Sequence, residues 1–191
     1  MPADNEFVNF LGKQYNLINL VVYAYLYCAS SFNYYLITFY LKYLPGNIFQ
    51  NMMVASLAEF TASLAIGFVV RKLGHKNAFT ATFGFFTISS LCLALAIQFE
   101  AAQLMPVILM VAKLTSTGAI ATVYMSSLVF FPNQFLGTVF GICGSSAKFV
   151  TIFSPMVAES PEPTASATMI LSGALATFLS VWLCESKDEF K

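Results

Sequence analysis

The chain has 191 residues, of which 58% are hydrophobic and only 9% are charged, and its formal net charge is zero. A soluble domain carries about 25% charged residues. This composition therefore excludes a water-soluble globular domain and indicates an integral membrane protein. The lack of a net positive charge also argues against a nucleic-acid partner.

The first 15 residues are mixed in polarity, and we expect them to form an amphipathic lead-in on the membrane surface. They lack the pattern of a cleavable signal peptide. Six apolar stretches follow, each about as long as the 20 helical residues that a bilayer core requires. They cover residues 17–41, 48–70, 77–98, 105–131, 135–158 and 165–184. We therefore predict an all-α fold, an integral membrane six-helix bundle over residues 16–184, with a polar tail over residues 185–191.

The distribution of lysine and arginine predicts the topology of these spans. Six spans place both ends of the chain on one side of the membrane, and the connections are short, so consecutive helices should be antiparallel. The side that holds the ends collects Lys13, Arg71, Lys72, Lys76, Lys187 and Lys191. The other side has Lys42 alone, together with Glu100, Glu159 and Glu162. Because cytoplasmic loops carry an excess of positive residues, we predict that the termini face the cytosol or a matrix.

Three ionisable residues, Glu59, Lys113 and Lys148, fall inside predicted spans. At 1.5 Å per helical residue they lie about 12–17 Å from the same, outer, end of the bundle. Charged residues at this depth usually face a cavity or a partner. We therefore expect one polar layer in which Glu59 pairs with a lysine. The alternative is three unrelated charges whose lysine side chains reach outward to the interface.

Tyrosines near this layer are candidates for binding an organic ion. A tyrosine combines an apolar ring with a polar hydroxyl, and the candidates are Tyr34, Tyr35 and Tyr124. Packing in the core or at the membrane interface would explain each of them equally well.

Small residues in the fifth span predict close helix packing. Gly137 and Gly141 form a GxxxG pattern, and Gly144 follows in the next turn. Such faces allow helix backbones to approach closely.

The sequence offers no pattern of catalytic or metal-binding residues. The four cysteines lie in apolar stretches without CxxC spacing, which is typical of small buried side chains. The single histidine, His75, lies in a basic loop. We therefore predict a protein that is not an enzyme and that holds no metal or cofactor.

Several motifs occur in an order that resembles the C-terminal six helices of major facilitator transporters, within them the organic cation and anion transporter family. The resemblance covers about residues 16–187. Residues 31–35 and 46–48 resemble the family's seventh helix and its exit. Glu59 lies twelve positions before Arg71, and with the loop residues Lys72, Gly74, His75 and Lys76 it resembles the eighth helix and the basic loop after it. Lys113, residues 123–124 and Pro132 match the tenth helix, residues 146–148 and 154–155 the eleventh, and residues 184–186 the acidic turn that ends the last helix.

The chain departs from this family at its loop charges. The family's basic loop begins with an aspartate, where this chain has Arg71. The glutamate and arginine that flank the proline after the family's tenth helix are Val129 and Leu136 here. In the family these charges take part in the transport cycle. Lys148 stands where anion-transporting members carry arginine, so the resemblance implies an organic anion as substrate.

The resemblance also implies a partner, because the transporters consist of two six-helix halves with the site between them. This chain corresponds to one major-facilitator half, and alone it would turn a charged face toward lipid. We favour an accessory subunit of a larger membrane complex, with membrane lipid or a neighbouring subunit against that face. The alternative is a split transporter that moves small organic anions together with another six-helix half. A third interpretation is one part of a cleaved or split gene product.

Overall fold

The structure is a computed structural model, and it describes residues 14–44, 46–99, 103–161 and 163–182. This part of the chain contains six helical spans that are long and apolar enough to cross a membrane, which confirms the predicted all-α six-helix bundle. Residues 1–13 of the predicted lead-in and the whole predicted tail at 185–191 lie outside the described residues.

The helices follow one another in the order expected from the apolar stretches. Their bounds are α2 Gln14–Tyr40, η1 Leu41–Tyr43, α3 Ile48–Leu73, α4 His75–Gln98, α5 Met105–Phe130, α6 Leu136–Thr151, α7 Ser154–Ala158 and α8 Thr164–Trp182. The short 3-10 helix η1 continues α2 to the end of the first span.

The fifth span differs from its prediction, because it is broken into α6 and α7. Pro155 explains the break. A proline has no N–H to donate to the carbonyl four residues earlier, and its ring clashes with that carbonyl, which here belongs to Thr151. The backbone N–H groups of Ile152 and Phe153 instead donate to carbonyls three residues back, at 3.3 and 3.2 Å.

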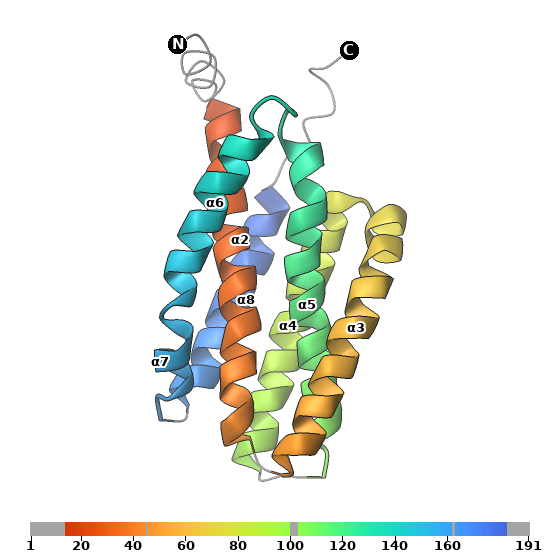
Figure 1. Cartoon of the computed structure of the whole chain (residues 1–191), viewed down its shortest axis with the longest axis vertical. Helices are drawn as coiled ribbons and strands as arrows, with labels where there is room; N and C mark the ends of the chain where they lie inside the picture. Colours follow the sequence, from red (N-terminus) through yellow and green to blue (C-terminus); the bar gives the residue numbers. More distant parts are fainter. Residues whose placement is uncertain (1–13, 45, 100–102, 162, 183–191) are drawn as a thin grey trace.

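The bundle has two layers. Figure 1 shows α6, α2, α5 and α3 side by side in the nearer layer, with α8 and α4 behind them. The central helix α2 contacts α5, α6 and α8, while α4 contacts α5 and α8. The first turn of α2 and the last turn of α8 lie at the same end, as an even number of spans requires (Figure 1).

The helices differ in how much of their surface the chain itself covers. Of the most apolar window of each span, 61% is buried for the first span but only 17% for the span 136–158 formed by α6 and α7. Large apolar side chains on the outside, such as Phe49, Phe60 and Phe68 of α3, are exposed. Such side chains suit a hydrocarbon solvent, and α6 has the face that is most available to another molecule.

Candidate functional site: a polar layer across four helices

The centre of the polar layer is an ion pair between α5 and α3. The ammonium Nζ of Lys113 lies 2.6 Å from Oε1 of Glu59. The Lys113 side chain is 1% exposed, whereas that of Glu59 is 34% exposed. The pairing expected from their common depth is therefore present, and Lys113 is the lysine that forms it.

Two residues of α2 complete the surroundings of the Lys113 ammonium. Nζ donates a second hydrogen bond to Oγ1 of Thr38, at 2.6 Å. It also lies 4.1 Å from the centroid of the Tyr34 ring, a distance at which a cation is attracted to an aromatic face. Thr38 was not among the predicted residues. Its position four residues after Tyr34 places it on the same helix face, which is the signal that could have found it.

Lys148 of α6 is exposed and extends this layer on the other side of α2. Its Nζ lies 5.3 Å from the Tyr35 ring centroid, and the rings of Tyr34 and Tyr35 meet edge to face at 5.2 Å. Within the described ranges no carboxylate lies within 4.0 Å of Nζ of Lys148, since the ion pairs found there involve other lysines. One carboxylate and two ammonium groups thus leave the layer with an excess positive charge.

Tyr124 does not belong to this layer. It follows Lys113 by eleven residues on α5, which corresponds to about 16 Å along the helix axis. Its ring instead contacts Tyr27 at 5.5 Å and stacks on Phe140 at 5.9 Å. The structure therefore brings together two of the three predicted tyrosines and places the third in a separate aromatic cluster between α2, α5 and α6.

The predicted basic loop forms the turn between α3 and α4. Gly74 adopts φ +79°, ψ 163°, a backbone conformation that is almost restricted to glycine, and its N–H caps α3 through the carbonyl of Val70. Nδ1 of His75 lies 3.0 Å from Oγ of Ser126, which ties the turn to α5. Arg71 and Lys72 are exposed in the last turn of α3, where positive charge complements the helix dipole. Lys76 follows in the first turn of α4 and is half-buried.

The predicted packing glycines of α6 face open space. A Cβ atom built on Gly137 or Gly141 meets nothing within 4 Å in the described part of the chain. At Gly144 the nearest atom is the Tyr27 hydroxyl, at 3.8 Å. The GxxxG pattern therefore mediates no close helix approach within the described chain, and its face is open to another molecule.

Among the glycines of the described helices, Gly173 has the least space around it, and the sequence pattern did not single it out. A Cβ atom at this position of α8 would lie 2.8 Å from Oγ1 of Thr87 and 3.0 Å from Cδ1 of Phe86, both on α4. A glycine flanked by Ser172 and Ala174 was the available sequence signal. That signal does not say which helix lies opposite.

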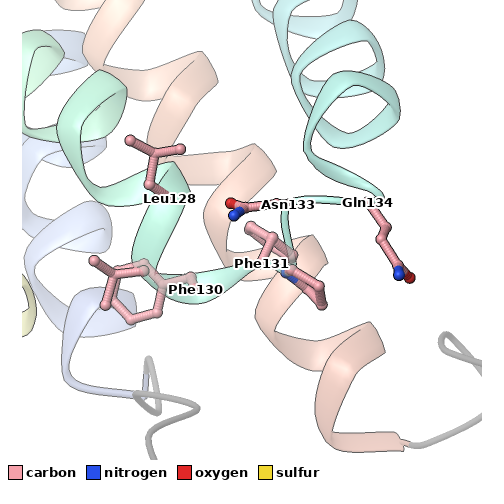
Figure 2. A pocket seen from close by; sticks show the side chains of 7 residues that line it. Leu128, Phe130, Phe131, Asn133 and Gln134 are labelled. Carbon is pink, nitrogen blue, oxygen red and sulfur yellow. The ribbon is translucent and has the colours of Figure 1, made fainter. Parts of the chain in front are cut away.

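A pocket of about 380 Å³ lies at the turn between α5 and α6, far from the polar layer. Figure 2 shows that Asn133 is directed toward the end of α5 near Leu128, whereas Gln134 points away. The lining comes from the continuous segment 128–134 and contains no charged side chain. The pocket therefore offers no charged group that would attract an ion.

Among the residues that the structure describes, no three His, Cys, Asp or Glu side chains gather in a group that could hold a metal ion. Cys28, Cys92 and Cys143 form no disulfide bond. Cys184 lies outside the described residues.

Comparison of the sequence with models of protein families and with curated proteins found no match. The polar layer is thus the basis for assigning a function.

Proposed function

We propose that the chain is an accessory subunit of a larger membrane complex, built on one half of the major facilitator fold. The observation that carries this proposal is the position of Lys148. Lys148 is exposed near the middle of the fifth span, and among the described residues its Nζ lies 5.3 Å from the Tyr35 ring and pairs with no carboxylate. A lysine at mid-membrane depth costs about 2.5–3.5 kcal/mol on insertion scales, unless a partner or water compensates the charge.

We place the proposed partner against the open face of α6. Gly137 and Gly141 precede Lys148 at helical spacing and lie on the same stripe of α6. No side chain of the described residues comes within 4 Å of a Cβ atom at either glycine, which allows a helix of another subunit to approach closely. A carboxylate on that helix, or a lipid phosphate held between the subunits, would then neutralise Lys148.

The test is to isolate the native assembly in mild detergent after placing a photo-crosslinking residue at Gly141. We expect a cross-link from Gly141 to a second membrane protein, and no cross-link from the exposed Leu171 of α8. Lys148→Ala should reduce co-purification of that protein, whereas Lys148→Arg should preserve it because the charge remains. The matched control is Lys72→Ala, which removes an exposed lysine outside the polar layer.

A chain that purifies alone from its native membrane, with no cross-link at Gly141, would contradict the proposal. So would a partner whose binding survives Lys148→Ala and Lys148→Glu unchanged.

The alternative function is one half of a split transporter for small organic anions. A specific observation favours it: Lys148 and Glu59 are both accessible, and the half-buried rings of Tyr34 and Tyr35 lie between them. A positive charge beside aromatic rings suits a planar carboxylate. Co-expression with another six-helix half should then give saturable anion uptake that Lys148→Ala abolishes. Binding of the partner without any uptake would leave only the accessory role.

We also propose that the end of the bundle with Arg71, Lys72 and Lys76 faces the cytosol or a matrix, since positive residues collect there. In a cysteine-free background, Lys72→Cys should react with an impermeant thiol reagent from that side alone. Ser160→Cys, at the opposite end, should react from the other side. Labelling of both from the same side would contradict a six-span topology.

A further inference from the structure

An apolar groove runs between α3, α4 and α5. It has a volume of about 270 Å³. Its walls include Ala62 and Ile66 of α3, Phe85 of α4 and Gly118 of α5. No charged side chain lines it. Small residues along its floor leave room for a flexible apolar chain.

A second depression, of about 500 Å³, adjoins this groove at the turn between α3 and α4. It is lined by Lys76, Asn77 and Thr80 of α4, together with Val181 near the end of α8. Leu73 and Ala81 line both depressions, so the one that holds Lys76 lies directly beside the apolar groove.

The two depressions together match the dimensions of a lipid in one leaflet. From Lys76 to Phe85 the chain advances nine residues along α4, or about 13.5 Å. Half of the hydrocarbon core of a bilayer is about 15 Å thick. The groove therefore reaches from the membrane interface to about the bilayer centre, the depth that one acyl chain occupies.

The charge at the interfacial end selects the kind of lipid. Lys76 is half-buried, and within the described ranges no carboxylate pairs with it or with the neighbouring Arg71 and Lys72. Basic residues at this level attract anionic lipid headgroups.

We propose that this groove is a binding site for an anionic phospholipid, with the phosphate at Lys76 and one acyl chain between α3, α4 and α5. Asn77 adds amide donors beside the phosphate. The site involves α4 of the rear layer and is separate from the stripe of α6 that carries Lys148, so it does not depend on the proposed function (Figure 1).

The test is lipid binding to the purified, delipidated full chain, measured by native mass spectrometry. Phosphatidylglycerol and phosphatidylcholine with identical acyl chains are added in turn. We expect phosphatidylglycerol to bind preferentially, and Lys76→Gln to weaken its binding about fivefold, the contribution of one basic residue near an anionic surface. Lys42→Gln, at the opposite end of the bundle, should leave binding unchanged.

A second pair of variants tests the groove. Ala65 lines it and is exposed, so Ala65→Phe should fill the groove without disturbing the core and lower phosphatidylglycerol binding. The matched control Leu64→Phe changes the neighbouring exposed position, which does not line the groove.

Equal binding of the two lipids, or unchanged binding in both Lys76→Gln and Ala65→Phe, would overturn the proposal. Displacement of phosphatidylglycerol by millimolar inorganic phosphate would show that Lys76 binds free anions, and it would overturn the proposal as well.

Discussion

Removal of the Glu59 carboxylate should destabilise the bundle more than removal of the Lys113 ammonium. The two partners differ in burial, since the Lys113 side chain is 1% exposed and the Glu59 side chain 34%. Glu59→Gln keeps a hydrogen-bond acceptor but leaves the buried ammonium without the negative charge that neutralises it. Lys113→Met leaves a carboxylate that remains partly accessible.

The size of each effect follows from these exposures. Breaking a fully buried ion pair by removing one partner costs about 3–5 kcal/mol. A buried lysine without a carboxylate partner lowers the free energy of unfolding by at most about 4–5 kcal/mol at pH 7, because the ammonium can lose its proton instead. Partial access to Glu59 lowers the cost, so we expect about 2–4 kcal/mol for Glu59→Gln and about 1–2 kcal/mol for Lys113→Met. The free energy of unfolding of the double variant should lie within about 1 kcal/mol of that of the original chain, because neither partner is left as an unpaired buried charge.

Equilibrium unfolding in mixed micelles, followed by the circular dichroism of the helices, measures these differences. The four chains form a double-mutant cycle, and we expect a coupling energy of at least about 2 kcal/mol. The control is the exposed pair Lys42–Glu159, with Nζ 3.2 Å from Oε1, whose loss should cost less than about 1 kcal/mol. Equal costs for the two single variants, or a double variant as unstable as Glu59→Gln, would refute the reasoning.

The remaining predictions concern glycines and use the same unfolding assay. Gly141→Ala should stabilise the isolated chain by up to about 1 kcal/mol, because alanine favours a helix and the site is open. The free energy of unfolding of Gly173→Ala should be about 1–3 kcal/mol lower than that of Gly141→Ala, since the new methyl group overlaps Thr87 and Phe86. Equal stability of the two variants would mean that α4 and α8 are not in close contact at this position. Gly74→Ala should cost about 1–3 kcal/mol through backbone strain at the end of α3, and an unchanged midpoint would rule out its positive φ.

The sequence by itself determined the class of fold and the depth of the charges. Apolar stretches of about 20 residues are needed to cross the hydrocarbon core, and each one was recognisable from its length and its polar boundaries. The helical rise converts sequence position into depth, so residue numbers alone place Glu59 and Lys113 at one level of the membrane. The need to compensate a buried charge then predicted an ion pair.

Only the tertiary structure decided which groups meet at that level. Depth does not fix the rotation of a helix about its axis or the identity of its neighbours, because packing against the other helices sets both. Lys113 rather than Lys148 therefore pairs with Glu59, and Thr38 contributes a contact that no pattern singled out.

The glycines give the same lesson. The GxxxG pattern of α6 faces open space, whereas Gly173 packs tightly against Thr87 and Phe86 of α4. A small residue permits a close approach, but which helix approaches depends on how the whole chain packs.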